Sequence, residues 1–426
     1  MNCSFLYHAW GLQKLECNRE EYKGSDLILN VRYQHRKKVC PKCGKRHLVK
    51  NGYRFRDFLG LPIGRKRVII RMKIQRYKCK ECGYDQQEDI PFATGSRSYT
   101  HRFAKYVVDL LKMATLKDVA NMLSVSWDMV KEIHTHYLQL HYSPPSLEGV
   151  ECIGIDEFAV KKGHVYKTIV VDLMSGRIVY VGDGKGVESL KKFWQRVKKL
   201  GIKIKYVATD LSAAFTASVM ENAPDAIHVF DHFHANNLVQ NAVDEVRRKQ
   251  YAMEKDINKR NVLKGNRYLL LMNGEDILDG KFKTRLDNAL AMNEPLSKAY
   301  YLKEDFREIW RQPTKAMGEA KLEDWCKRAQ ESNVQPMQKV AATIMAHRTG
   351  ILAWYDVSIS TAKVEGINNK IKVMKRNAYG FRDDKYFRLR LYAYMTAVSL
   401  EMSDEPELFD FRVVSGRKAA NQRRTG

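Results

Sequence analysis

Two short cysteine pairs near the N-terminus constrain the fold of this chain more than any other feature. They read CPKCG at 40–44 and CKECG at 79–83. Two residues between thiolates let one tight turn direct both sulfur atoms at a single ion, and the following glycine supplies the positive φ of such a turn. The pairs predict a closed structural zinc site at Cys40, Cys43, Cys79 and Cys82. The alternative is four free thiols that only happen to pair.

The 35 residues between Cys43 and Cys79 exceed the usual zinc-site spacer of about 15–20 residues. Within them Ile70, Met72 and Ile74 alternate with polar residues, which is the pattern of a half-buried strand. We therefore expect a small β-ribbon whose ends are held together by the metal.

Positive charge is concentrated in the same segment. The 426 residues include 74 Lys and Arg against 49 Asp and Glu, for a net charge of +25. Residues 35–80 carry 17 Lys or Arg and one acid, Asp57, with the aromatic residues Tyr53, Phe55, Phe58 and Tyr77 between them. A surplus of this size predicts an anionic partner, and the density favours contacts with DNA phosphates over a merely solvated face.

The composition excludes several other classes. Aromatic residues make up 10% of the chain, which argues against disorder. No apolar run exceeds five residues, so we expect no membrane span. The N-terminus has no basic segment followed by an apolar one, so we expect no secretory signal. We expect a cytoplasmic, nucleoid-associated protein whose eight cysteines are not disulfides.

Residues 115–138 have the pattern of a helix-turn-helix. Apolar residues recur at helical spacing on both sides of a break at Ser124–Ser126, and Ser126 can cap the second helix. The second helix is expected to direct Trp127, Asp128, Lys131, Glu132 and His134 outward, with Trp127 and Lys131 as candidate DNA contacts. A plain helical hairpin is the alternative.

From Glu151 onward the pattern changes to short strands. Strands are expected at 152–156, 164–173, 177–182, 204–210 and 227–231, with helices at 187–200 and 212–222. Three antiparallel strands followed by helix-linked parallel strands is the order of an RNase H-like α/β fold. In that fold the first and fourth strands are neighbours.

Acids end these strands. Asp156 and Asp210 would face each other, and Glu365 would add a third carboxylate from a basic helix. The cations of this helix are candidate contacts to DNA phosphates: Lys372, Lys375 and Arg376. Mg²⁺ (or Mn²⁺) binds carboxylate oxygens, and two ions can activate the attacking oxygen and stabilise the leaving one in phosphodiester chemistry. Asp231 and His234 lie close in sequence to the third strand end. They either support the acids, with His234 contacting DNA or bracing the site, or form an ordinary helix cap.

A long insertion separates Asp210 from Glu365. The 154 residues between them are too many for a structureless loop, and they show helical periodicity. We expect an all-α subdomain at 241–355, which either grips DNA or holds a partner chain.

Four motifs together resemble a known family. They are Ile155-Asp156-Glu157, Ala208-Thr209-Asp210-Leu211-Ser212, the Asp-x-x-His of Asp231 and His234, and Val364-Glu365-Gly366-Ile367-Asn368-Asn369-Lys370-Ile371-Lys372. The chain resembles DDE transposases of insertion sequences, most closely the group called ISL-three. The resemblance implies a zinc domain, a helix-turn-helix and an RNase H-like domain with an all-α insertion, in this order.

The expected domains follow from these readings. They are a zinc-binding domain at 1–92, a helix-turn-helix domain at 93–147, the first catalytic part at 148–240, the insertion at 241–355, the second catalytic part at 356–405 and a basic flexible tail at 406–426.

The leading hypothesis is an enzyme that cuts the 3′ ends of its own element and joins them to target DNA, as a dimer when bound to two ends. The main alternative is a DNA-binding regulator with an inactive RNase H-like domain. A resolvase or another nuclease shares the chemistry, but it has no need for two DNA-reading modules.

Overall fold

The computed structural model describes residues 3–34, 39–161, 165–357, 359, 362–378 and 380–400, which form two compact units. The first unit contains the described residues up to Ser143 together with 377–389, and the second contains those of 144–376 together with 390–399. The expected tail at 406–426 and residues 401–405 of the second catalytic part lie outside the described residues. No helix in the described ranges is long and apolar enough to cross a membrane.

A long antiparallel hairpin forms the centre of the first unit. Strands β3 (Leu48–Ile63) and β4 (Lys66–Cys79) pair from Ile63–Lys66 at the turn to Leu48–Cys79 at the open end. Ile70, Met72 and Ile74 are fully buried on β4. The expected ribbon is therefore present, and its open end lies at the cysteine pairs.

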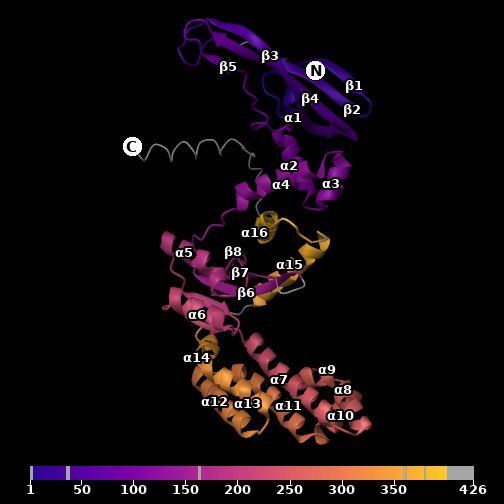
Figure 1. The fold of residues 1–426 in the computed structure, drawn as a ribbon, viewed down its shortest axis with the longest axis vertical. Coiled ribbons are helices and arrows are strands. Elements are labelled where there is room, and N and C mark those ends of the chain that lie inside the picture. The colour runs from indigo at the N-terminus through magenta and orange to yellow at the C-terminus, as the bar shows by residue number, and fades with distance from the viewer. Residues whose placement is uncertain are drawn as a thin grey trace. The chain divides into compact units, whose positions relative to one another are not determined.

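The sheet is larger than the sequence analysis anticipated. Helix α1 (Cys3–Trp10) and strands β1 (Leu15–Lys23), β2 (Asp26–Tyr33) and β5 (Asp85–Gln87) complete a five-stranded sheet in the order β1-β2-β4-β3, with β5 beside β4 (Figure 1). Strand β2 runs parallel to β4. Its apolar side chains share one core with Trp10 and Phe58.

Three helices follow the sheet: α2 (His101–Leu110), α3 (Leu116–Leu123) and α4 (Trp127–Tyr142). Thr115 and Asp118 cap α3 reciprocally, and the Ser126 side chain accepts a hydrogen bond from the Met129 amide at the start of α4. Ser124 adopts the left-handed conformation (φ 51°) that ends α3. The turn between α3 and α4 thus lies where the sequence predicts it.

One expectation about α4 is wrong. His134 does not point outward but is buried, and its Nδ1 lies 2.8 Å from the Tyr386 hydroxyl at the start of α16 (Asp384–Leu400). The periodicity of α4 alone could not reveal this contact, because the segment that covers His134 lies about 250 residues later in the chain.

The second unit is built on another five-stranded sheet. Strands β6 (Cys152–Lys161), β7 (Val165–Asp172) and β8 (Ile178–Asp183) are antiparallel, whereas β9 (Tyr206–Thr209) and β10 (Ile227–Phe230) run parallel to β6. The order is β10-β9-β6-β7-β8, so the first and fourth strands are neighbours as expected. The 3₁₀ turn η1 (Val187–Leu190) with α5 (Lys191–Leu200), and α6 (Ala213–Asn222), lie at the expected positions.

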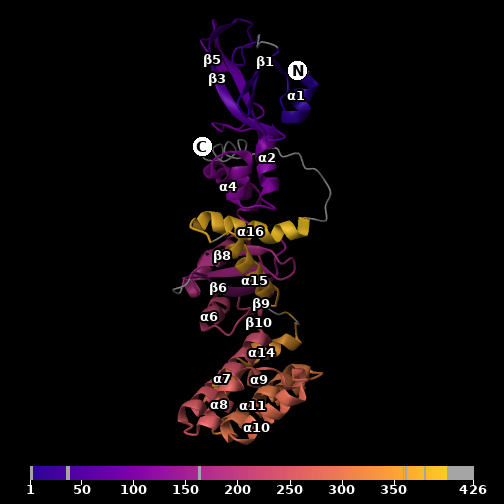
Figure 2. The same cartoon turned by 90° about the vertical axis from the view of Figure 1, so that its right-hand side faces the viewer.

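Helices cover both faces of this sheet. Helices α5 and α6 share a core with Ile153 and Ile155 of β6. Helix α15 (Ala362–Asn377) lies beside β6 (Figure 2). It packs on the opposite face of the sheet, where the Val364 side chain contacts Gly154. Because successive strand residues alternate between faces, Asp156 lies on the same face as Gly154, under α15.

The expected insertion is all helical. Its helices share one core that includes Phe306, Leu322 and Trp325. The elements are α7 (His232–Met253), α8 (Ile257–Gly265), α9 (Arg267–Leu271), η2 (Gly274–Asp276), α10 (Gly280–Ala291), α11 (Glu294–Phe306), η3 (Arg307–Arg311), α12 (Lys315–Glu331), α13 (Gln335–Ala346), α14 (Arg348–Leu352) and η4 (Ala353–Tyr355) (Figure 1).

We predict that Gly154→Ala loosens α15 from the sheet. A Cβ at this position would lie 2.6 Å from Val364 Cγ2 and 2.8 Å from Leu173 Cδ2, so the second unit should lose about 1–3 kcal/mol of stability in denaturant unfolding. Gly366→Ala, on the same helix with nothing within 4 Å of the added methyl, is the control and should be neutral or slightly stabilising. Equal stability of the two variants would contradict the packing.

Candidate functional site

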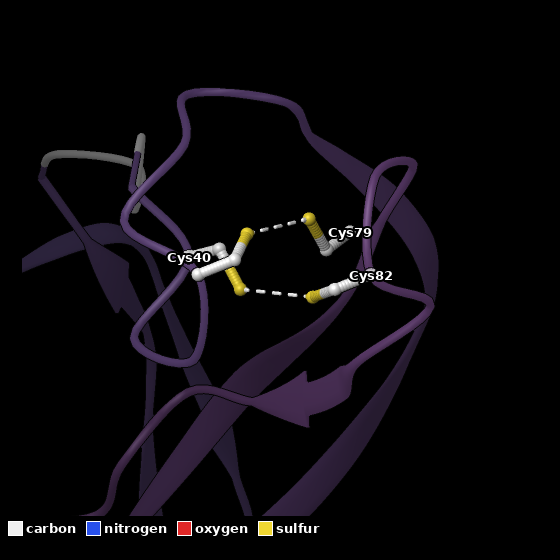
Figure 3. A group of neighbouring side chains, drawn as sticks. Cys40, Cys79 and Cys82 are labelled. Atoms are coloured by element: carbon white, nitrogen blue, oxygen red, sulfur yellow. Dashed lines mark hydrogen bonds between the residues drawn. The ribbon is translucent and has the colours of Figure 1, made fainter.

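The four cysteines of the two pairs converge. Their sulfur atoms all lie within 4.8 Å of one another, and the Cys40–Cys82 and Cys43–Cys79 sulfur pairs are each 3.7 Å apart (Figure 3). A tetrahedral zinc ion with bonds of about 2.3 Å separates its sulfur ligands by about 3.8 Å. The observed spacing therefore fits zinc, and four protein ligands leave no position for a substrate.

Two similar turns position these sulfur atoms. The Gly44 amide donates to the Cys40 carbonyl at 2.9 Å, and the Gly83 amide donates to the Cys79 carbonyl at 3.0 Å. Both glycines have positive φ, 71° and 68°, as the sequence pattern requires. Hydrogen bonds, chiefly from the Cys82 backbone amide, lower the pKa of Cys79 to about 7. The Lys45 amide lowers the pKa of Cys43, but burial and the other three sulfurs outweigh it and raise this pKa to about 11.

Three aspartates lie on or directly after three neighbouring strands of the second unit. Asp210 and Asp231 directly follow β9 and β10, whereas Asp156 lies within β6, which continues to Lys161 instead of ending at residue 156 as expected. Gly154 of β6 pairs with Ala208 of β9, so the same register continued by two residues places Asp156 beside Asp210. The Asp231 amide donates to the carbonyl of Thr209, which directly precedes Asp210. The predicted adjacency of the first two acids thus follows from the sheet register, since neighbouring strands are about 4.8 Å apart.

Burial disfavours the charge of these carboxylates. It raises the pKa of Asp156 to about 6, and the negative charges of Asp210 and Asp231 add to the effect, while the Glu157 amide and His234 oppose it. Burial also raises the pKa of Asp210. Strand alternation places Glu157 on the side of β6 opposite Asp156. Burial nevertheless raises the pKa of Glu157, and so do the charges of Asp210 and Asp156.

Asp231 and His234 occupy the start of α7. The Asp231 side chain is buried and accepts a hydrogen bond from the Phe233 amide at 3.0 Å, so it forms the helix cap that was one of the two alternatives. It also contributes charge to the group of acids, and His234 acts on both Asp156 and Asp210. The cap and a supporting role therefore coexist.

Helix α15 presents two different faces. Glu365, Asn369, Lys372 and Arg376 are exposed, as helical spacing predicts, whereas Val364, Ile367, Asn368, Ile371 and Met374 are buried. Among the residues that the structure describes, the cysteines are the only group of three or more His, Cys, Asp or Glu found gathered as a metal site. The structure therefore does not gather Asp156, Asp210 and Glu365 into one such group within the described residues, and Glu365 is exposed.

Two lysines attach α15 to the sheet. Lys375 Nζ donates to the Ala159 carbonyl at 2.8 Å, and Lys363 Nζ donates to the Leu173 carbonyl at 2.6 Å. Lys375, a candidate DNA contact, is thus engaged with β6, while Lys372 Nζ donates to the neighbouring Asn369 side chain at 3.1 Å. Asn368 was not predicted from the sequence, and its Nδ2 donates to Asp156 Oδ2 at 2.7 Å.

The two candidate DNA contacts on α4 differ in their surroundings. Trp127 is 44% exposed, whereas Lys131 forms a 2.7 Å ion pair with Asp383 and lies 5.2 Å from the centre of the Trp127 ring. Glu132 accepts hydrogen bonds from Arg97 and Tyr99. Lys131 is therefore available to a phosphate only in competition with Asp383.

Comparisons with known proteins agree with this arrangement. Residues 153–391 match the ISL3 transposase family, and residues 36–82 match the zinc-finger of the transposases of IS204, IS1001, IS1096 and IS1165. The chain is 30% identical over 390 residues to the transposase for insertion sequence element IS1001 of Bordetella parapertussis, covering 91% of this chain and 95% of that protein. The chain belongs to the ISL3 family of insertion sequence transposases.

Two further similarities are weaker. The transposase for insertion sequence element IS1557 of Mycobacterium tuberculosis is 26% identical over 368 residues, covering 80% of this chain and 82% of that protein. A chain of the Drosophila P element transposase strand transfer complex aligns with a TM-score of 0.40 and 11% identity, covering 71% of this chain and 92% of that one.

We predict one zinc ion per chain and a strictly local effect of its loss. Cys82→Ser removes a ligand, and because structural zinc contributes about 10–16 kcal/mol to zinc-finger folding, the segment before about Ile90 should unfold while the second unit stays folded. Metal analysis and hydrogen exchange measure both effects. Cys17→Ser, in the same domain but outside the cluster, should retain zinc. A metal-free protein with an ordered N-terminal sheet would contradict the prediction.

We also predict that Asp210→Asn stabilises the second unit at pH 8 in the absence of divalent cations. The pKa of Asp210 is raised on folding, so its charge destabilises the fold above that pKa and ceases to do so as the pH falls toward the unfolded value near 4. The amide keeps an oxygen for the Ser212 amide. Calorimetry of the zinc-loaded protein should show a larger gain in Tm at pH 8 than at pH 5.5.

Asp305→Asn is the control of opposite sign. Burial alone would raise the pKa of Asp305, but Lys321 and Arg328 more than offset it and hold this pKa below its ordinary value. Its substitution should therefore destabilise the unit, most strongly at pH 8. If Asp210→Asn also loses stability at pH 8, the charge of Asp210 does not destabilise the folded second unit.

Proposed function

We propose that this protein is the transposase of its own insertion sequence. It would bind the terminal inverted repeats, cleave the 3′ ends by metal-dependent hydrolysis and join the freed 3′-hydroxyls to target DNA by transesterification. The observation that carries the proposal is the pair of half-buried acids under a basic helix: the sheet register places Asp156 of β6 beside Asp210, and α15, which packs on this face of the sheet, carries Glu365 on its exposed side.

The proposed catalytic domain is RNase H-like. The sheet order β10-β9-β6-β7-β8, antiparallel on one side of β6 and parallel on the other, supports this assignment. The two catalytic parts at 148–240 and 356–405 would enclose the insertion at 241–355. The helices of 93–147 would serve as a helix-turn-helix behind the zinc domain of 1–92.

The acids suit a hard divalent cation. Mg²⁺ or Mn²⁺ prefers carboxylate oxygens, and its charge would offset the cost that burial places on Asp156 and Asp210. Asp156, Asp210 and Glu365 would hold the metal, which would supply activation of the attacking oxygen and stabilisation of the leaving one. Asp231 and His234 would support these acids from the start of α7.

DNA contacts are proposed at three places. On the zinc domain, exposed Tyr53 and Phe55 lie among basic side chains, with Lys73 Nζ 4.0 Å from the centre of the Tyr53 ring. On α4, Trp127 and Lys131 would face the DNA after a phosphate replaces Asp383. On α15, Lys372 and Arg376 are exposed, whereas Lys375 would have to leave the Ala159 carbonyl.

The principal alternative is a DNA-binding regulator with an inactive domain. Carboxylates whose burial raises their pKa cost stability at neutral pH, and a regulator gains nothing from keeping them together.

Because an element has two ends and each needs an active site, we propose that the protein acts as a homodimer on DNA. Short inverted repeats flanking the gene would favour transposition over another nuclease activity.

The catalytic prediction is tested by cleavage of labelled end DNA with Mg²⁺ or Mn²⁺. Asp156→Asn, Asp210→Asn and Glu365→Gln each keep the side-chain shape but remove a charged oxygen ligand. Each should reduce cleavage and joining by at least about 1,000-fold, because phosphoryl transfer depends on closely placed metal, and each should leave end binding within about twofold.

Glu221→Gln on the exposed surface of α6 is the matched control and should cleave normally. Glu157→Gln should be tolerated far better than the three acid substitutions, although its carboxylate lies in the field of the site. Robust cutting by Glu365→Gln would show that the third ligand is another residue and that α15 serves only to hold DNA.

A further inference from the structure

Asn368 is a polar residue in an otherwise apolar stripe. The side chains that flank it on the buried face of α15, Val364, Ile367, Ile371 and Met374, are at most 3% exposed, and Asn368 itself is 8% exposed. Burying an amide costs stability unless its polar atoms are bonded. A leucine would suit this position better for packing alone, so the amide calls for another explanation.

The amide contacts the first catalytic acid. Asn368 Nδ2 donates to Asp156 Oδ2 at 2.7 Å, and the other carboxylate oxygen, Oδ1, accepts from the Glu157 amide at 2.8 Å. Both oxygens are therefore held by neutral donors, which fixes the plane of the carboxylate. Each oxygen retains a second lone pair for another partner.

The other end of the amide is unsatisfied. An ionised carboxylate only accepts hydrogen bonds, so the NH₂ group must face Asp156 and the oxygen must face away. In the described part of the chain Asn368 Oδ1 is buried and has no hydrogen-bond partner. An unpartnered buried oxygen beside the acids is suited to accept a hydrogen bond from water in a hydrated ion site.

Packing on both sides holds Asn368 in place. Along β6, contacts to α15 occur at Gly154, Asp156 and Ala159, and their partners are Val364, Asn368 and Lys375. Five residues of strand and eleven residues of helix each span roughly 17 Å, so helix and strand remain in step over this distance. The amide therefore meets Asp156 because the backbones fix its position.

We propose that Asn368 is a positioning residue that orients Asp156 toward the catalytic divalent cation. The inference rests on the proposed function, because it assigns Asn368 to the same metal site. Partners that hold ligand side chains typically contribute 10–100-fold to metal affinity or activity. Asn368 acts through the direction of the Asp156 oxygens, and its own oxygen is left for water in the site.

Mn²⁺ binding to the full-length, zinc-loaded protein without DNA tests the inference, with the free ion followed by electron paramagnetic resonance. Asn368→Leu should weaken the affinity by about 10–100-fold. Its Tm should change little, since leucine completes the apolar stripe but leaves Asp156 Oδ2 without its amide donor. Cleavage should need correspondingly more Mn²⁺, with an unchanged KM for end DNA. Asn369→Leu, one residue away on the exposed face, should bind Mn²⁺ like the unaltered protein.

Asn368→Ala is the second variant if Asn368→Leu does not fold, and it should show the same loss of affinity. Asp156→Asn is the reference. If Asp156→Asn binds Mn²⁺ normally, the proposed metal site itself fails. If Asp156→Asn loses the ion while both Asn368 variants keep normal affinity, the proposed function stands and the inference about Asn368 is overturned.

Discussion

The packing of α15 against β6 is the contact on which the catalytic proposal depends. Strand β6 supplies Asp156, its parallel pairing with β9 brings Asp210 alongside, and α15 carries Glu365 across from a distant part of the chain. The close approach requires Gly154, because any larger residue would collide with Val364. A site assembled in this way tolerates a long insertion between its second and third acids, since the insertion has its own core and only its two ends must return to the sheet.

Much of the second unit was predictable because its signals are local. Short apolar runs that end in an acid gave β6, β9 and β10, and the order of strands and helices implied their neighbours. In the first unit the cysteine spacing predicted the convergence of the four cysteines. The alternation at Ile70, Met72 and Ile74 predicted β4. Strand β2 was missed because its run Leu27–Leu29 is buried on both faces and does not alternate, and its partner β4 lies about 40 residues away.

The site was less predictable wherever a residue contacts a partner that is distant in the sequence. Helical periodicity separates the exposed face of α15 from the buried one, but it cannot show that Asn368 meets Asp156 across 212 residues. Similarly, Lys375 reads as a free cation, yet it bonds to the Ala159 carbonyl, and His134 reads as exposed, yet it lies against Tyr386. An amide within an apolar stripe was the one available signal for Asn368.

The two units differ in how the charged side chains of their candidate sites are paired. Among the described residues, no lysine or arginine is bonded to half-buried Asp156 or Asp210, and burial raises the pKa of both carboxyls, so the proposed divalent cation would offset this cost. On α4 the reverse holds, because Lys131 is already neutralised by Asp383 and an incoming phosphate must compete for it. The chain leaves α15 at Asn377 and reaches Asp383 six residues later. The acid that pairs with Lys131 therefore belongs to the segment that follows the helix carrying Glu365.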